Sequence, residues 1–278
     1  MIAPFLCKIF NKSPQLGSLP SDWKLASGVP VQKKGAKDHV ENYRPISLFP
    51  VVSKVFERCA LNRFMDHLYH VISPKQHGFW IGRSCVTNLL EAFDHIGSLL
   101  DSGSRVDTIY FDMSKAFDKV SHRRLVHKLI QAGFGGKLLN WFCSYLSGRR
   151  QRFTVLGATS EDLPVTSGEP QGSLLRPALF LLYVNDLPEV ISSSSRVLMF
   201  LNDTKIFSEI KTLGDASSLQ KDLGKSIGKL ATWSQSSGLL FNEAKYKAQH
   251  ITRKTADLIV VFCILVILVS HTLTADYS

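Results

Sequence analysis

Helical and β-rich segments alternate irregularly along this 278-residue chain. Amphipathic helices are predicted over 51–70 and from a Ser84 cap to Leu100, because apolar residues recur there at helical spacing. The run 106–111 is typical of a β-strand, and two apolar runs around the pair 202–203 predict a β-hairpin. Strands scattered among helices, without a regular βαβ order, favour an α+β fold.

The remaining segments give weaker signals. Helices are predicted over 123–132 and 137–146, around 219–233, and after Gly172 with interruptions at Pro177 and Pro188, and short strands over 151–156 and 163–166. Residues 13–47 contain four Pro and three Gly, so a loop-rich N-terminal segment is expected there.

An apolar run lies close to the C-terminal end of the sequence. Residues 258–269 are all apolar, and no Asp, Glu, Lys or Arg follows before residue 274. The 16 residues 258–273 would span about 24 Å as a helix, less than the roughly 30 Å hydrocarbon core of a membrane. The run is therefore either a marginal membrane anchor or a buried helix or strand.

The positive charge is concentrated in one half of the chain. Residues 1–150 contain 21 Lys and Arg against 11 Asp and Glu, whereas residues 151–278 contain 12 of each. A basic half favours a polyanionic partner such as nucleic acid, and an ordinary solvated surface is the alternative. Five Cys without C-x-x-C pairs argue against a zinc module or a disulfide scaffold and indicate a reducing compartment. The first residues lack the pattern of a secretory signal peptide.

Two acidic residues stand where β-rich runs end or turn. Asp112 closes the run 106–111, and Asp203 lies at the tip of the predicted hairpin. Carboxylates that converge from strand ends suit divalent cations, which prefer oxygen ligands. The alternative is that both are solvated residues at strand ends.

Two further segments have the composition of binding loops. Residues 167–173 combine Gly, Pro and Gln before a predicted helix, which allows close approach to a ligand. Residues 75–83 mix basic and aromatic side chains that could bind phosphate and stack on bases. An ordinary turn and an ordinary loop around a packed Trp80 are the alternatives.

Taken in order, these segments resemble the reverse transcriptase domain of non-LTR (LINE-type) retrotransposons. The matching stretches are Leu19–Lys24, Asn42–Leu48, Lys54–Arg58, Gln76–Phe79 with Arg83–Ser84, Phe111–Asp118, Pro170–Ser173, Phe200–Lys205, and Gly238–Leu239 with Asn242 and Lys245. The resemblance implies a lead-in over 1–18, a reverse transcriptase domain with right-hand polymerase fingers and palm over 19–254, and an apolar tail over 255–278 outside the family domain.

The resemblance also implies a chemistry, which is two-metal nucleotidyl transfer by an RNA-directed DNA polymerase. Its partners would be an RNA template, a DNA primer and deoxynucleoside triphosphates, and its cofactor two Mg²⁺ ions held by Asp112 and Asp203. Lys245 would protonate the leaving pyrophosphate, with a plain surface lysine as the alternative.

The nucleotide site follows from the same resemblance. Phe117 would lie under the sugar of the incoming nucleotide and exclude a 2′-hydroxyl, with a plain core Phe as the alternative. Gln171 and Gly172 would line the nucleotide pocket, and Arg83 would contact the triphosphate.

The chain departs from the family pattern in several places. Asn202 occupies the position of the first hairpin aspartate, which is a catalytic metal ligand in the family, and Leu201 replaces a small residue. Glu169 and Arg176 place charges where the family has an apolar residue and a Gly. A family thumb is not expected after residue 254, where the sequence continues into the apolar run, and an endonuclease domain is not expected before Met1. These departures predict a degenerate copy with weak or absent polymerase activity.

Two alternative functions stay open. One is a non-catalytic RNA- or DNA-binding remnant, and the other is a membrane-tethered protein with 258–274 as its anchor. An intracellular location, nuclear or cytoplasmic, is expected for the first, and membrane association through the tail for the second. The sequence sets no oligomeric state.

Overall fold

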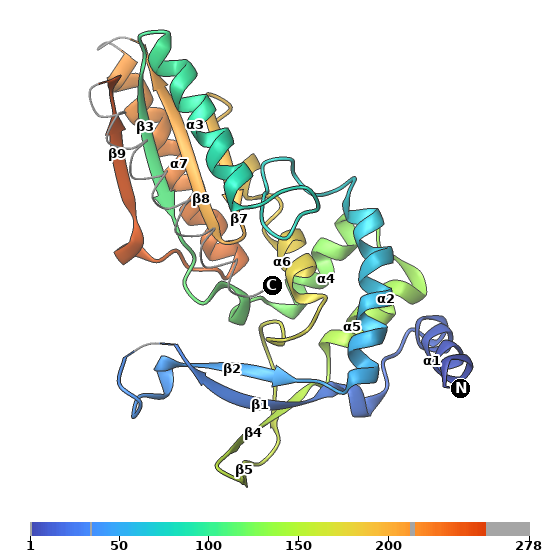
Figure 1. The fold of residues 1–278 in the computed structure, drawn as a ribbon. Helices are drawn as coiled ribbons and strands as arrows, with labels where there is room; N and C mark the ends of the chain where they lie inside the picture. Colours follow the sequence, from blue (N-terminus) through green and yellow to red (C-terminus); the bar gives the residue numbers. More distant parts are fainter. Residues whose placement is uncertain (1, 34, 212–214, 254–278) are drawn as a thin grey trace. The chain divides into compact units, whose positions relative to one another are not determined.

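The computed structural model describes residues 2–33, 35–211 and 215–253, which form two compact units (Figure 1). The first unit comprises Met1–Ile72, Lys115–Asn185 and Ser237–Leu239. The second unit comprises Ser73–Ser114, Asp186–Ser236 and the described residues from Leu240 to Arg253. Each unit combines helices with a sheet, so the α+β class expected from the sequence is confirmed.

The first unit joins a helical cluster to a small mixed sheet. The sheet has the strand order β2-β1-β4-β5, with β6 also paired to β4. Strand β1 runs antiparallel to β2 and parallel to β4. The elements are α1 (Ala3–Leu16), β1 (Leu25–Gln32), β2 (Tyr43–Leu48), α2 (Val51–Leu68), α4 (His122–Gln131), α5 (Gly136–Leu146), β4 (Arg150–Val155), β5 (Ala158–Thr159), β6 (Leu163–Pro164) and α6 (Arg176–Tyr183).

The prediction of a loop-rich segment over 13–47 is wrong, because β1 and β2 form an antiparallel pair there. Pro30 and Pro45 lie directly opposite each other in this pair. The Lys33 N–H donates to the Asn42 carbonyl at 2.7 Å, so counting back along the register makes the Pro30–Pro45 rung a non-hydrogen-bonded one. Two prolines can share such a rung without removing a ladder hydrogen bond.

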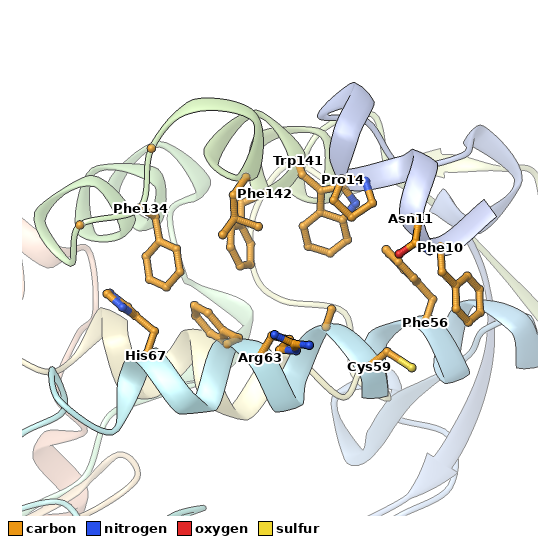
Figure 2. Close-up of a pocket in the computed structure, with 15 residues that line it drawn as sticks. Phe10, Asn11, Pro14, Phe56, Cys59, Arg63, His67, Phe134, Trp141 and Phe142 are labelled. Atoms are coloured by element: carbon orange, nitrogen blue, oxygen red, sulfur yellow. The ribbon is translucent and has the colours of Figure 1, made fainter. Parts of the chain in front are cut away.

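Aromatic side chains fill the helical cluster of the first unit. Phe56 and Phe64 of α2 meet Trp141 and Phe142 of α5 with ring centroids 5.1–5.5 Å apart. Beside them lies a cavity of about 680 Å³, into which these rings and Phe134 face (Figure 2). The burial of large rings in tilted and edge-on contacts stabilises this cluster.

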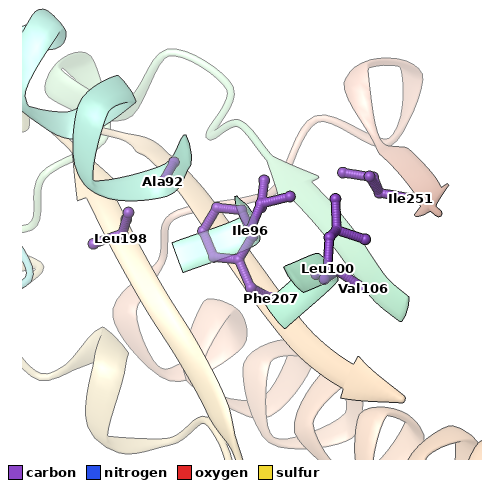
Figure 3. Close-up of a cluster of buried hydrophobic side chains, with 7 residues drawn as sticks. All are labelled: Ala92, Ile96, Leu100, Val106, Leu198, Phe207 and Ile251. Atoms are coloured by element: carbon purple, nitrogen blue, oxygen red, sulfur yellow. The ribbon is translucent and has the colours of Figure 1, made fainter. Parts of the chain in front are cut away.

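The second unit is a four-stranded antiparallel sheet with helices. The strand order is β7-β8-β3-β9. Helix α3 packs on one face, where a cluster of buried apolar side chains joins it to the strands (Figure 3). The elements are α3 (Cys85–Asp101), β3 (Arg105–Phe111), β7 (Ser195–Phe200), β8 (Asp203–Ile210), α7 (Asp215–Ser237) and β9 (Lys247–Ile251). The cluster comprises Ala92, Ile96, Leu100, Val106, Leu198, Phe207 and Ile251.

Several sequence expectations are corrected in their details. The helix expected after Gly172 begins only at Arg176, and Pro177 lies in its first turn, where a missing N–H costs nothing. The hairpin turn consists of Leu201 and Asn202, one residue earlier than expected, so Asp203 belongs to β8. Helix α1 and strand β9 were not expected from the sequence.

The apolar run 258–269 lies outside the described residues. Within the part that the structure describes, no helix combines the length and the apolar character needed to cross a membrane.

Candidate active site

Strand register brings Asp112 and Asp203 together at one end of the second unit's sheet. Strands β3 and β8 are antiparallel, with Phe111 opposite Thr204. One further step along this register places Asp112 opposite Asp203, although 91 positions separate them in the sequence. The convergence expected from the sequence is therefore present, and it follows from pairing between two adjacent strands.

Both carboxylate oxygens of Asp112 accept hydrogen bonds from side chains. The Asn202 amide nitrogen, Nδ2, donates to Oδ1 at 2.5 Å. The Lys245 ammonium donates to Oδ2 at 2.6 Å and forms an ion pair with it. Asp112 is 15% exposed and Lys245 is 63% exposed, so the ion pair is open to solvent on the lysine side.

Backbone pairing beside Asp112 positions Lys245 at the site. Met113 forms an antiparallel bridge with Phe241, and the Asn242 N–H donates to the Asp112 carbonyl at 2.8 Å. The short helix η5 (Glu243–Lys245) follows directly. This pairing continues the β3–β9 side of the sheet, and it fixes Lys245 next to Asp112 by backbone hydrogen bonds rather than by side-chain contacts alone.

The turn that contains Asn202 is strained, and hydrogen bonds to the Gln76 side chain, called here the Gln76 brace, hold it in place. Leu201 has a φ of 58°, in the left-handed region that Gly usually occupies. The side-chain oxygen of Gln76 accepts hydrogen bonds from the backbone N–H groups of Leu201, at 2.9 Å, and Gly78, at 2.8 Å. A Cβ on Gly78 would lie 2.6 Å from the Leu201 side chain, so only glycine fits there.

The segment that holds Gln76 is itself attached to β7. Met199 donates its N–H to the Lys75 carbonyl at 2.8 Å and accepts from the His77 N–H at 2.9 Å, which forms a short parallel bridge. The sequence patch 75–83 therefore supports the turn through Gln76 and Gly78. Gln76 was not singled out as a site residue, and its near-complete burial, with 3% exposed, is not visible in a sequence.

Electrostatics couple the two carboxylates. Partial burial and the negative charge of Asp112 raise the pKa of Asp203, whereas Lys245 and Lys205 act in the opposite direction. The hydrogen bond from Lys245 to Asp112 raises the pKa of Lys245. The lysine is therefore held as a cation beside two acidic groups.

Arg83 also lies in the second unit, and its guanidinium is used locally. Its Nη1 donates to the carbonyls of Pro74 and, at 2.9 Å, Gln76. Arg83 thereby stabilises the loop before the Gln76 brace. A contact with a triphosphate stays a prediction.

In the first unit, Phe117 is half-buried against helix α6. Its ring stacks on Phe180 with centroids 4.1 Å apart, and the Arg176 guanidinium lies over it at 4.7 Å. Arg176 also donates to Asp118 at 3.3 Å. These contacts hold the ring in one orientation, and Arg176 is one of the residues in which the chain departs from the family pattern.

Gln171 and Gly172 form a tight contact with β2. The Ser47 N–H donates to the Gln171 carbonyl at 2.7 Å. Gly172 has a φ of 114°, and a Cβ there would lie 2.4 Å from the Ser47 carbonyl oxygen. Gln171 lines a cavity of about 350 Å³ together with Lys115 and Arg150. This loop therefore requires glycine for backbone approach, as its composition indicated.

The carboxyl group of Glu169 is buried in the same loop. Only 3% of the residue is exposed, and neither carboxyl oxygen has a partner in the described chain. Burial raises the pKa of Glu169 well above its usual range, and the charge of Arg176 partly opposes this. The two charged departures from the family pattern are therefore electrostatically coupled to each other.

The donor set around Asp112 does not fit a pair of divalent cations. Such ions take several oxygen ligands each. Within 2–33, 35–211 and 215–253, no three His, Cys, Asp or Glu side chains group together to hold a metal ion. Asn202 turns its amide N–H toward Asp112, and the Lys245 ammonium lies on the other oxygen. The two Mg²⁺ ions implied by the family resemblance stay a prediction that this arrangement opposes.

Comparison with known proteins identifies the family of the chain. Residues 31–262 match the family described as reverse transcriptase (RNA-dependent DNA polymerase). A probable RNA-directed DNA polymerase from transposon X-element of Drosophila melanogaster is 35% identical over 191 residues, which is 66% of this chain and 21% of that protein. The corresponding protein from transposon BS of the same organism is 34% identical over 66% of this chain and 20% of its own length.

A third relative and a solved structure extend these matches. The RNA-directed DNA polymerase from mobile element jockey of Drosophila melanogaster is 29% identical over 77% of this chain and 24% of its own length. The chain thus spans about a fifth to a quarter of the curated relatives it matches. Apo telomerase from Candida tropicalis, truncated from its C-terminal domain, has a similar fold, with a TM-score of 0.59 at 11% identity over 84% of this chain and 51% of that one.

The family match covers most of the chain, and the three transposon proteins are all RNA-directed DNA polymerases or probable ones. The chain therefore belongs to the reverse transcriptase family and is related to the RNA-directed DNA polymerases of non-LTR retrotransposons.

Proposed function

We propose that residues 19–254 are the fingers and palm of a reverse transcriptase domain that binds an RNA template with a DNA primer, and that its nucleotidyl transfer is weak or lost. One observation carries this proposal. Asp112 and Asp203 meet at the end of an antiparallel sheet, but the residue beside them is Asn202, whose amide donates to Asp112. The meeting of two carboxylates supports inherited catalytic positions, and the amide of Asn202 stands where the resemblance implies a third carboxylate.

In this proposal, Asp112 and Asp203 are the inherited catalytic positions. Lys245 is the candidate general acid for the leaving pyrophosphate in this proposal. Its ion pair with Asp112 opposes that role, because the pair raises the pKa of Lys245 and holds the proton. A general acid works best with a pKa near the operating pH. This arrangement supports weak rather than full activity.

The nucleotide side of the proposal lies in the first unit. Phe117, fixed by Phe180 and Arg176, has the flat and immobile surface that discrimination against a 2′-hydroxyl by bulk requires. Gln171 and Gly172 border the cavity of about 350 Å³, whose wall includes the cations Lys115 and Arg150. A deoxynucleoside triphosphate is the ligand we propose for this loop, whereas the phosphate contact of Arg83, which lies in the second unit, stays a separate prediction.

Charge supports the nucleic-acid part. The first unit contains 20 Lys and Arg against 9 Asp and Glu, a net charge of +11, whereas the second together with residues 254–278 contains 13 against 14, a net charge of −1. Phosphate backbones bind through such cationic surfaces and release counterions. We therefore place the template and primer contacts mainly on the first unit.

The test is a salt titration with a matched pair of variants. Affinity for an RNA–DNA duplex, measured by fluorescence anisotropy, should fall steeply from roughly 50 to 200 mM salt. Exposed Arg44 on β2 and exposed Arg105 on β3 give the comparison, one in each unit. Arg44→Gln should lower the affinity and reduce the salt slope by about 1, whereas Arg105→Gln should change neither. A flat salt response, or equal effects of both variants, would overturn the proposal.

A further inference from the structure

Asp112 lies at the centre of a closed polar cluster, defined by Asp112, Asn202, Asp203 and Lys245. Asn202 occupies one oxygen of the Asp112 carboxylate and Lys245 occupies the other, at 2.5 and 2.6 Å. These distances leave no space for a cation between donor and acceptor on either side. The lone pairs of Asp112 that these two contacts use are therefore not available to a metal ion.

Each partner of Asp112 is positioned by contacts of its own. Asn202 is carried by the turn that Gln76 braces through the Leu201 N–H. Lys245 is carried by η5, where its N–H donates to the Asn242 carbonyl at 2.9 Å, while Asn242 donates to the backbone of Asp112. Two separate elements therefore deliver a donor to the same carboxylate, and neither needs a metal ion to arrive there.

The charge count of the cluster agrees with this geometry. Asp112 and Asp203 contribute two negative charges and Lys245 one positive charge, so the cluster carries −1. A carboxylate at position 202 would make it −2 and would place an acceptor against the Oδ1 of Asp112. Like charges in contact repel unless a cation lies between them. The Asn202 amide replaces this repulsion with a hydrogen bond.

We propose that the chain's own Lys245 ammonium and Asn202 amide take the place of divalent cations in this cluster, so that the site is held closed without metal. The inference takes Asp112 as the family's catalytic position, as in the proposed function. It does not depend on nucleic-acid binding, and its test contains no nucleic acid. Binding of RNA–DNA duplex in EDTA measures the other proposal separately.

The first measurement uses the unmodified full-length chain. Its melting temperature in EDTA and in 10 mM MgCl₂ should agree within about 1 °C, a difference well below the effect of 1 kcal/mol in a chain of this size. A titration with Mn²⁺, followed by electron paramagnetic resonance, should show no binding that Asp112→Asn removes. Mn²⁺ binding that is lost in Asp112→Asn, or a Mg²⁺ stabilisation of several degrees, would overturn the proposal.

The second measurement restores the carboxylate. Asn202→Asp should lower the melting temperature in EDTA by about 2–4 °C and recover most of that loss in MgCl₂. Exposed Asn62 on α2 provides the control, because Asn62→Asp adds the same charge far from the cluster in sequence and in the other unit. If Asn202→Asp behaves like Asn62→Asp in both buffers, the amide is not what closes the site, and the proposal fails. Should Asn202→Asp not fold, the Mn²⁺ titration of the unmodified chain still decides.

Discussion

Two hairpin turns, one in each unit, place a leucine at a positive φ. Leu156 between β4 and β5 has a φ of 49°, and Leu201 between β7 and β8 has a φ of 58°. Leu156 is fully exposed, whereas Leu201 is half-buried and its N–H is held by the buried Gln76. Left-handed backbone at a non-Gly residue persists where the surroundings fix it. The Gln76 brace therefore holds the turn between β7 and β8 in a fixed position.

The units differ in what they bury as well. The second unit uses a buried amide, Gln76, to satisfy two backbone donors. The first unit buries Glu169, whose carboxyl oxygens have no partner in the described chain. A satisfied buried polar group fixes a conformation, whereas an unsatisfied one costs stability. This contrast yields three predictions.

Removing the Gln76 brace should have the largest effect on the free energy of unfolding. Gln76→Leu leaves the N–H groups of Leu201 and Gly78 without their acceptor, and we expect the free energy of unfolding to fall by about 2–3 kcal/mol. Urea denaturation measures this loss. Gln32→Leu in the first unit is the control, because the side chain of exposed Gln32 donates to the Gly35 carbonyl at the surface and satisfies no buried group. Equal losses of stability at the two positions would show that the Gln76 brace contributes no more than a surface hydrogen bond.

Removing the buried acid should have an intermediate effect of opposite sign. Because burial raises the pKa of Glu169, the folded protein binds this proton more tightly than the unfolded chain does. The stability it contributes is present at low pH and is lost as pH rises through the folded pKa. Glu169→Met should therefore stabilise the protein by about 1–2 kcal/mol at pH 8, and the gain should shrink toward pH 5.

Urea denaturation across this pH range, with exposed Glu161→Gln as control, tests the effect. Buried Glu57 also has a raised pKa, so part of the pH dependence should survive in the variant. A gain that is the same at every pH would contradict the assignment to Glu169.

The smallest predicted effect is a difference in stability between glycine variants of the two turns. Leu156→Gly should raise the free energy of unfolding by about 0.5–1 kcal/mol, because glycine adopts a positive φ without strain and no buried contact is lost. Leu201→Gly should gain less, since its side chain packs against Gly78. Thermal denaturation of the two variants side by side measures the difference. A larger gain at Leu201 would mean that its packing contributes nothing.

The sequence predicted those parts of the fold that have strong local signals. The Ser84 cap and the apolar stripe of α3 were sufficient, and the structure confirms the cap, including a capping box with Thr87. The β7–β8 hairpin was found from its apolar runs, but its turn was placed one residue late, because Leu201 is not a typical turn residue. Strand β9 is polar and mostly exposed, so it lacks the alternation that reveals a strand.

The candidate site was predictable only in part for a related reason. Asp112 and Asp203 follow strand signals, and their convergence could be expected. The donor role of Asn202 toward Asp112 and the brace from Gln76 depend on contacts across 90 and 125 positions, which no local pattern contains. The prolines of β1 and β2 predict a loop rather than strands, because each proline alone removes a donor and only the register of the pair makes this loss harmless.

The parallel pairing of β1 with β4 has a consequence for synthesis on the ribosome. Leu25 pairs with Arg150, so the edge of β1 that pairs with β4 has no partner until 125 further residues have been synthesised. At about 5–20 residues per second, this delay lasts roughly 6–25 s, during which an unpaired strand edge can associate with other nascent chains. Pro30, on its non-hydrogen-bonded rung with Pro45, has its nitrogen on that waiting edge and removes one donor from it. The residue that obscured the strand in the sequence thus leaves this edge with one donor fewer, two residues beyond the stretch Leu25–Gly28 that later pairs with β4, while the polypeptide is still being made.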